Sequence, residues 1–577
     1  MSHSLINVKL MGDLIERRWV LWLVFFSAWF FGLVLPLFLY TNDFVASGAT
    51  TEVLQSTMAT AWFIEYFAAI AGTVLAGAVS VCVVWEPLFN KAAATFYGSA
   101  PLSRKTIFGT FYLAGLLPLI VIELVVALMT LVVALMFGAM DLTYCLNWLL
   151  LTVSSTVIFY TMAVICGQLT GSRAVLVAIY LALLCGVGAL EFTAESIISL
   201  LLPNVVFTNE PLLWFSPALA LVFYGFDGAD PNWVVTSVYL LISIPVGVGA
   251  AALNGRRNLE SAAEIAAYPW VAGAFKFICA LFAGVFVGTL MVFDFGGSND
   301  QAPVGYAIFV ALSVSAACVL GLVLSESAMK RGNVWKRSWK QSVAAVCVVC
   351  LFVGVSAQDV LGMRSFVPDA SNVSSVRIAA NETMELAEKG NVERAIQIHR
   401  DLMLLKEPEG TEDMASMTTV EVAYTMSDGE EVARKYKVWA DADASTNNPR
   451  DVVADELEEL ASTNEALDSR FSKQLNASAK GFWASLEYQV GDQWKTVNLD
   501  SDDYSSFVSA VKRDMKKTGA AHTFLFGYNL DTEGQLASVR FGTDDVVSME
   551  VTKSTTPETI KWFKNHKGLD LTQTASS

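Results

Sequence analysis

Long apolar segments fill the first 356 residues and limit the fold of this chain more than any other feature. A bilayer core needs about 20 consecutive apolar residues per helix, and nine segments meet or approach that length. The first is too long for a signal peptide, and no small-residue cleavage site follows it. The sequence therefore predicts a polytopic α-helical membrane protein with about nine transmembrane helices, at approximately 19–40, 61–85, 108–137, 146–167, 174–190, 233–253, 270–293, 303–325 and 341–357.

The last part of the chain has a different composition. Residues 357–577 contain 37 acidic and 23 basic residues, a net charge of −14 out of −17 for the whole chain. All eight cysteines precede this region, so it has no disulfide and needs a hydrophobic core of its own. We expect a C-terminal soluble α/β (α+β) domain at 358–577, and its negative charge disfavours nucleic acid as a partner.

Alternation of apolar and polar residues predicts two β-hairpins in this domain. The first joins 418–426 to 431–440 through Ser427–Asp428–Gly429, and the second joins 482–490 to 494–499. Helical patterns lie at about 383–405, 451–460, 503–517 and 556–565. The domain offers neither a metal-ligand cluster nor a nucleophile–base pattern, so the sequence predicts no metal site and no catalytic residue.

The basic residues before position 357 indicate how the chain crosses the membrane. With the N-terminus inside, all fifteen lie in cytoplasmic pieces, whereas the loops 41–60, 138–145, 191–232 and 294–302 contain none. Lysine and arginine are enriched in cytoplasmic loops. We therefore expect the N-terminus inside and, after nine spans, the C-terminal domain outside.

Two further segments favour positions at the membrane surface. Residues 1–18 form an amphipathic pattern typical of an interfacial helix on the cytoplasmic face. The apolar stretch "LLWFSPALALVFYGF" (212–226) is interrupted by Ser216 and Pro217, which indicates a re-entrant or interfacial helix on the outer face. The alternative, a tenth span, would place the C-terminal domain inside and break the separation of basic residues.

The loop at 86–106 has the pattern of a folded segment. Ala92–Phe96 favours a helix that Gly98 can end, and Pro101 forces a turn before Ser103, which can cap the next helix. A short helix held between two spans can transmit force from a soluble partner. The simpler interpretation is a plain connection whose Arg104 and Lys105 set the topology.

Three parts of the chain resemble bacterial ABC-2 type transporter permeases. "FYGSAPLSRKTIF" is similar to the cytoplasmic loop of these permeases, in which a Pro-Leu-Ser-Arg turn follows a coupling helix. The matching residues are Pro101, Leu102, Ser103 and Arg104, after Phe96 and Tyr97, although Ala100 replaces a frequent leucine. "NGRRNLESAAE" (254–264) resembles a second basic segment of the family. Segments 395–403, 420–438 and 556–568 resemble the extracytoplasmic domain of one subgroup, whose function is unassigned.

This resemblance implies a function and a division of the chain. Residues 19–254 would form a six-span permease core and 255–357 three additional spans, in a multi-pass protein of the bacterial cell membrane. The loop at 86–106 would dock on a separate ATP-binding subunit. No G-x-x-x-x-G-K-[ST] segment occurs in the sequence, so ATP and magnesium are expected on that partner and no cofactor on this chain. A second permease copy or a sister subunit would complete an exporter surrounded by membrane lipid.

Two carboxylates lie inside predicted spans. A charge at the bilayer centre costs at least ~2.5–3.5 kcal/mol, so Glu123, five residues after Pro118, should face the bundle interior. Glu65 lies near the end of its span and can reach the headgroups. Each is a candidate for the transport path, and the alternatives are an internal hydrogen bond for Glu123 and a snorkelled side chain for Glu65.

Small residues recur every fourth position on the second predicted span. Such spacing lets another helix approach closely. The resulting face could pack inside the molecule or form a subunit seam, and it consists of Ala68, Gly72, Ala76 and Ser80.

Two other classes of function compete with transport. A membrane sensor would use the C-terminal domain to bind a ligand and would need no ATPase. A membrane glycosyltransferase would need paired catalytic acids in an outer loop, but 41–60 offers only Asp43 and Glu52. Co-purification with an ATPase separates the transporter from both.

Overall fold

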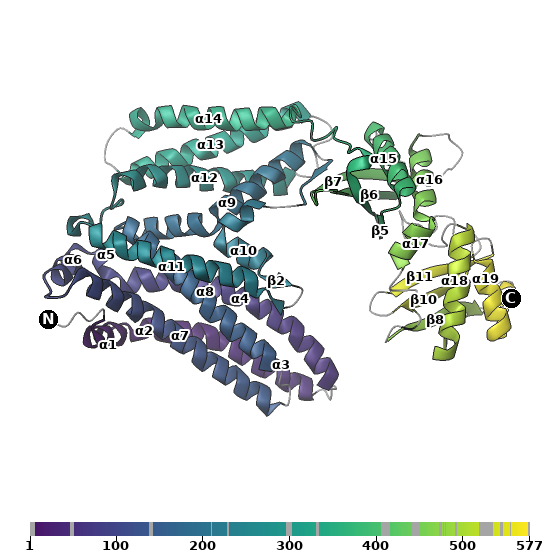
Figure 1. Cartoon of the computed structure of the whole chain (residues 1–577), viewed down its shortest axis with the longest axis horizontal. Helices are drawn as coiled ribbons and strands as arrows, with labels where there is room; N and C mark the ends of the chain where they lie inside the picture. Colours follow the sequence, from purple (N-terminus) through teal and green to yellow (C-terminus); the bar gives the residue numbers. More distant parts are fainter. Residues whose placement is uncertain are drawn as a thin grey trace. The chain divides into compact units, whose positions relative to one another are not determined.

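The computed structural model divides the chain into two compact units (Figure 1). The membrane unit comprises Met1–Ile197 and Glu210–Gly354, and the C-terminal unit comprises Ile198–Asn209 and Val355–Ser577. The structure describes residues 6–46, 51–137, 142–202, 204–208, 211–227, 230–295, 303–329, 334–405, 416–440, 449–471, 476, 478, 481–490, 493–518, 535–542, 546–553 and 556–574.

Nine helices within these described ranges are long and apolar enough to cross a membrane. The first span is continuous through α2 (Trp19–Trp29), a π-helical turn (Phe30–Val34) and α3 (Leu35–Ala46). The other eight are α4 (Thr51–Val84), α7 (Arg104–Met136), α8 (Leu142–Leu169), α9 (Arg173–Leu201), α11 (Trp233–Arg256), α12 (Pro269–Phe295), α13 (Pro303–Met329) and α14 (Val334–Ala357).

The spans agree with the predicted segments, but several are longer. The fifth, expected at 174–190, is the 29-residue helix α9, because the less apolar residues after position 190 continue its backbone hydrogen bonding. Within 212–226 the only α-helix is α10 (Pro217–Phe223), with seven residues. At about 1.5 Å rise per residue this helix is too short to cross a bilayer, so the structure contains no tenth span there.

Helices α12 and α13 pack as a close antiparallel pair (Figure 1). A Cβ placed on Gly284 would lie 2.6 Å from Cys318 Sγ, and one on Gly321 would lie 2.5 Å from the Cys279 carbonyl oxygen. Lys276 and Glu326 form an ion pair between the two helices. Small residues therefore let α12 and α13 approach closely. The ion pair is a second contact between the same two helices.

The C-terminal unit contains the same ββαββα module twice. The first module runs through β4 (Val373–Ala379), β5 (Thr383–Leu386), α15 (Lys389–Leu404), β6 (Ser416–Met426), β7 (Glu431–Ala440) and α16 (Pro449–Ala461). The second runs through β8 (Trp483–Val490), β9 (Gln493–Asn498), α18 (Tyr504–Thr518), β10 (Gln535–Gly542), β11 (Val546–Thr552) and α19 (Pro557–His566). The short helices α17 (Asn464–Phe471) and α20 (Leu571–Thr574) follow each module.

The two sheets have identical strand order. The first sheet is ordered β7-β6-β4-β5 and the second β11-β10-β8-β9, and every pairing is antiparallel. The first sheet has one additional strand, β1 (Val205–Val206), which pairs with β7. This strand comes from the connection between α9 and α10, far from the rest of the module in sequence.

The buried positions of the two module helices confirm the equivalence. Five buried positions correspond, namely Ala395, Ile396, Ile398, His399 and Leu402 in α15 and Phe507, Val508, Ala510, Val511 and Asp514 in α18, whereas Val392 and Met515 are each buried in one helix only. The spacing is the same in both. Each module also has its own hydrophobic core. The repeated module was not predicted from the sequence, because corresponding positions carry different side chains.

The structure confirms both predicted hairpins and corrects one helix. β6 pairs with β7 around Gly429, whose φ of 89° suits glycine, and β8 pairs with β9. The pattern at 383–405 predicted a continuous helix, but its first residues form β5, and α15 begins at Lys389. Thr383–Leu386 pairs with β4, and that pairing overrides the local helical pattern.

Candidate coupling site at the ends of the membrane helices

The loop at 86–106 is folded, as its sequence predicts. It contains α5 (Glu86–Phe89) and α6 (Lys91–Gly98). Asn90 caps α6 by accepting a hydrogen bond from the Ala92 amide, and Ser103 caps α7 by accepting one from the Thr106 amide. Two caps therefore fix the start of α6 and the start of the following span.

Aromatic side chains hold α6 against the membrane helices. The Tyr97 ring lies 5.1 Å from that of Phe111 on α7, in an edge-on arrangement. Ala94 is buried on the same side. Phe96 points away from the core and is 69% exposed. α6 is thus a braced helix that presents a large apolar side chain at its surface.

Arg104 joins the two segments that resemble ABC-2 permeases. Its Nη1 donates hydrogen bonds to the carbonyl oxygens of Gly255 (2.9 Å) and Arg257 (3.1 Å). Asn254 Nδ2 donates to the Arg104 carbonyl at 3.5 Å. Pro101 and Ser103 are exposed and Leu102 is half-buried in the turn before it. The turn at 101–104 is therefore tied to the end of α11, about 150 residues later in the chain.

Arg257 connects three elements from a buried position. Its Nη1 donates to the carbonyls of Gly167 (2.8 Å) and Gln168 (3.1 Å) near the end of α8. Its Nη2 donates to the Leu88 carbonyl in α5 at 3.1 Å, and its Nε to Ser261 Oγ at 3.2 Å. Burial lowers the pKa of this guanidinium to about 10, so it stays charged at neutral pH.

A second contact joins 255–268 to the connection between α8 and α9. Gly171 N donates to the Glu264 carbonyl at 2.7 Å, and Thr170 Oγ1 donates to the Ile265 carbonyl at 2.6 Å. A Cβ on Gly171 would lie 2.6 Å from Ala263 N. Only glycine allows this approach, and Ala263 itself adopts a φ of 64°.

Two more arginines bind carbonyls at the end of α4. Arg18 Nε donates to the Val83 carbonyl and Arg173 Nε to the Cys82 carbonyl, each at 3.0 Å. Arg18 also pairs with Glu86, and Arg173 lies over the Phe89 ring. The last carbonyls of a helix lack intrahelical partners and carry partial negative charge. The arginines expected from loop charge thus also act as C-terminal caps, a role the sequence did not predict for Arg18, Arg173 and Arg257.

Glu123 lies in the interior of the membrane unit, as predicted. It is 1% exposed on α7, and Thr156 of α8 donates a hydrogen bond to its Oε1. Its Oε2 has no hydrogen-bond partner among the described residues. The contact supports the predicted internal hydrogen bond, while the second oxygen leaves the transport-path hypothesis open.

Glu65 and the small-residue face lie on α4. Glu65 is half-buried in the first turn of the apolar part of this helix. Gly72 packs against the ring of Trp29, Ala76 is buried, and Ser80 Oγ donates to the Gly115 carbonyl on α7 at 3.1 Å. Ala68 is exposed. Three of the four predicted positions therefore pack inside this chain.

A close approach between α4 and α8 occurs elsewhere on α4. A Cβ on Gly77 would lie 3.1 Å from the backbone of Phe159 and Tyr160. This position falls outside the predicted stripe of small residues, although its identity as glycine was a usable signal.

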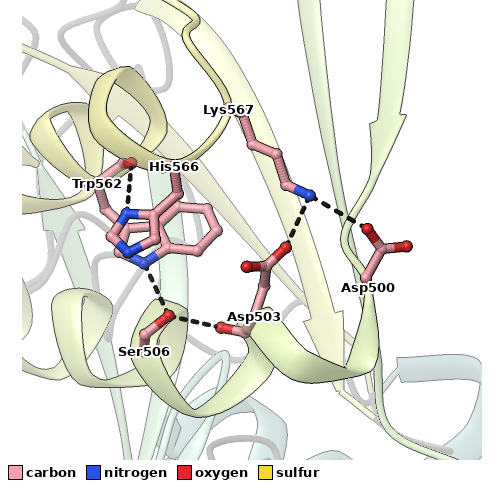
Figure 2. A network of polar contacts seen from close by, with 6 residues as sticks. All are labelled: Asp500, Asp503, Ser506, Trp562, His566 and Lys567. Carbon is pink, nitrogen blue, oxygen red and sulfur yellow. Dashed lines mark hydrogen bonds and ion pairs between the residues drawn. The ribbon is translucent and has the colours of Figure 1, made fainter.

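The second module carries a surface network of polar side chains (Figure 2). Lys567 pairs with Asp503 at 2.7 Å and Asp500 at 3.3 Å, and its hydrogen bond to Asp503 raises the pKa of the lysine. Trp562 Nε1 donates to Ser506 Oγ at 3.0 Å, and the Trp562 ring stacks on His566. These contacts fasten the end of α19 to the start of α18, so their role is structural.

The described residues contain no group of three or more His, Cys, Asp or Glu side chains that could hold a metal ion. The geometry instead gathers backbone carbonyls and arginines at the ends of α4, α5, α8 and α11, beside the exposed Phe96 of α6. Comparison with protein-family models, with curated proteins and with solved structures gave no match to this chain.

Proposed function

We propose that this chain is the membrane subunit of an ABC-2 type exporter, energised by a separate ATP-binding subunit that docks on the loop at 86–106. The contact between Arg104 and the carbonyls of Gly255 and Arg257 carries the proposal. The two segments resemble the same family independently, and they form one bonded assembly in this fold. The proposal therefore rests on two separate observations. Each segment resembles the family in sequence, and the fold joins the two segments by hydrogen bonds.

The mechanical properties of α6 support a coupling role. The helix is capped at its start, braced by Tyr97, and followed by a turn tied to α11 through Arg104. Arg257 extends the connection to α5 and α8. A displacement of α6 by a docked subunit would be passed to α7, α8 and α11, because the Tyr97 ring contact and the charge-assisted hydrogen bonds of Arg104 and Arg257 join these helices to the loop.

The exposed face of α6 suits protein contact. Phe96 is flanked by the exposed Lys91, Ala92 and Thr95, and large aromatic side chains in partner pockets contribute much of the affinity of protein interfaces. An exposed aromatic side chain on the same helix as an exposed lysine suits contact with a soluble partner, whereas a plain connection between two spans needs neither.

The proposed orientation also gains support from the C-terminal unit. β1 follows the fifth span, β7 follows the ninth, and they pair within one folded unit. Two paired strands lie on the same side of a membrane, so the number of intervening spans must be even. The intervening spans are α11, α12, α13 and α14, in agreement with a C-terminal unit outside and arginine-capped helix ends inside.

Co-purification in mild detergent tests the docking proposal. We expect a stoichiometric chain with a phosphate-binding loop to co-purify with the wild type, identified by mass spectrometry. Phe96→Ala should reduce its recovery at least about tenfold, since a central aromatic anchor contributes roughly 2 kcal/mol or more to an interface. Absence of any ATPase in several detergents would overturn the proposal and favour a sensor.

Arg104→Glu tests transmission of force, with Lys105→Glu as the matched control. Both substitutions reverse a charge at an exposed position, but only Arg104 binds the carbonyls of Gly255 and Arg257. We expect Arg104→Glu to lower ATP hydrolysis of the membrane-bound complex at least about tenfold, an effect of about 1.4 kcal/mol, and Lys105→Glu to have little effect. Equal hydrolysis in both variants would contradict the coupling role.

A further inference from the structure

The first module buries polar side chains at four core positions that carry apolar side chains in the second module. His399 is fully buried on α15, and both of its ring nitrogens have partners. Nε2 lies 2.7 Å from Tyr436 Oη and Nδ1 lies 2.8 Å from Tyr424 Oη. Arg434, 5% exposed, lies on β7 two residues before Tyr436. We call these four residues the polar core cluster.

Strand register identifies the corresponding residues of the second module. The last pair before each hairpin turn is Thr425 with Glu431 in the first module and Gly542 with Val546 in the second. Counting from these pairs and from the matching burial of α15 and α18, the positions of His399, Tyr424, Arg434 and Tyr436 are occupied by Val511, Phe541, Met549 and Val551. All four counterparts are buried and apolar, so the module folds without a polar core cluster.

The cluster reaches two chain segments that lead into membrane spans. Arg434 Nη2 donates to the Met363 carbonyl at 2.5 Å. Met363 belongs to a tight turn after α14, in which the Asp359 carboxylate accepts hydrogen bonds from the Met363 and Arg364 amides. Burial lowers the pKa of Arg434, and the negative charge of Asp359 opposes that lowering. Arg434 thereby binds the turn through both hydrogen bonding and charge.

The second segment is β1, which follows α9. Val205 pairs with Arg434, and Lys435 N donates to the Asn204 carbonyl at 3.0 Å. Thr208 Oγ1 donates to the Glu431 carbonyl at 3.0 Å. Arg434 therefore contacts both segments, β1 through its backbone and the turn at 359–364 through its side chain. The first segment continues from span α9 and the second from span α14.

We propose that the polar core cluster is a joint that fixes the first module to the chain segments entering spans α9 and α14. The hydroxyls of Tyr424 and Tyr436 orient His399. Arg434, two residues before Tyr436 on β7, joins the turn at 359–364 through its side chain and β1 through its backbone. A ligand or partner that moved the first module would pull on both spans together. This inference is independent of the proposed transport function.

Hydrogen exchange by mass spectrometry on the full chain in nanodiscs tests the joint. Arg434→Met, which installs the counterpart side chain, should accelerate amide exchange in 359–364 at least about tenfold, because the side chain binds the Met363 carbonyl. Exchange in 204–208, which pairs with the backbone of β7, and in β10 should stay unchanged. The matched control is Arg377→Met on β4 of the same sheet, because Arg377 is 42% exposed and pairs only with Glu421 in the described residues. Unchanged exchange of 359–364 in Arg434→Met would overturn the proposal.

A transplanted core separates the joint from the fold of the module. This variant combines His399→Val, Tyr424→Phe, Arg434→Met and Tyr436→Val with Ala395→Phe, because Phe507 fills the second module at the position of Ala395. We expect β4 and β6 to keep their protection while 359–364 loses its protection. Loss of protection throughout the first module, or retention of protection in 359–364, would each contradict the joint.

Discussion

The two modules of the C-terminal unit share one topology but differ in where they place polar groups. The first buries His399 between Tyr424 and Tyr436, whereas the second keeps its polar network at the surface, around Lys567 and Asp503. The second module fills its core with Phe507, Phe541 and Phe563 instead. The pattern of strands and helices is thus compatible with either kind of core.

This difference shows which residues the fold requires. A buried polar group must find partners to offset its desolvation, so the first module uses several side chains to satisfy one histidine. The second module has apolar residues at the corresponding positions, and its own buried acid, Asp514, accepts hydrogen bonds from the Glu558 and Thr559 amides. The fold of the module therefore does not require the polar core cluster, and the contacts of Arg434 with Met363 and β1 indicate a role outside folding.

The largest expected effect concerns the apolar core. Phe507→Ala should destabilise the second module by about 3–5 kcal/mol, because removing a buried phenyl ring leaves a cavity. The first module should keep its stability, because the substitution lies in the second module. The first module itself folds with Ala395 at the corresponding position. Urea unfolding of the full chain, followed by pulsed hydrogen exchange, reads the two modules separately.

Adding Val511→His to Phe507→Ala would reproduce the helix residues of the first module in the second. We expect no rescue, because Phe541 and Val551 offer no hydroxyl groups to the new histidine. Ser509→Ala, at an exposed position of α18, is the control. Full rescue by Val511→His would show that side-chain volume alone distinguishes the modules.

The next effect is a pH dependence confined to the first module. Burial, with the positive charges of Arg434 and Arg400, lowers the pKa of His399 to about 4. Between pH 6.5 and 4 the unfolded chain binds a proton that the folded module excludes, so stability falls as the pH falls. The loss should approach about 3 kcal/mol near pH 4.

Urea midpoints of the two modules at pH 7 and pH 4.5 measure this dependence, with exchange pulses at one fixed pH. The second module has Val511 at the corresponding position, so no buried histidine contributes to the pH dependence of its stability. His399→Val should remove the difference in slope between the modules. An unchanged slope in that variant would assign the pH dependence to other groups.

The smallest effect concerns helix caps that both modules receive from another helix. Glu465 of α17 accepts hydrogen bonds from the Ala387 and Glu388 amides at the start of α15. Asp514 of α18 accepts them from the Glu558 and Thr559 amides at the start of α19. Glu465→Ala and Asp514→Ala should each cost about 1–2 kcal/mol in their own module, measured by the same exchange experiment. A loss shared by both modules would show that they unfold together.

Hydropathy and local patterns predicted much of the membrane unit. Nine spans, the α6 helix and the Ser103 cap follow from apolar length and capping chemistry, which act over short distances along the chain. The burial of Glu123 followed from the cost of exposing a carboxylate to lipid. In the C-terminal unit the two hairpins were readable from alternation and turn residues.

The long-range contacts were not readable in the same way. Arg104 and Gly255 are separated by 151 residues, and no local rule pairs them. Arg18, Arg173 and Arg257 were expected only as positive charge, since their carbonyl partners depend on where other helices end. His399 was one of four histidines with no motif around it.

The sequence by itself therefore determined which segments enter the membrane and which form a separate acidic unit, because transfer from water to lipid depends on composition. Only the tertiary structure decided that the C-terminal unit repeats one module. It also decided that β1 completes the first sheet and that arginines close the ends of the spans. Those features depend on strand register and on hydrogen bonds between residues far apart in the chain. Many different side chains are compatible with the same backbone geometry, so the local sequence does not specify these contacts.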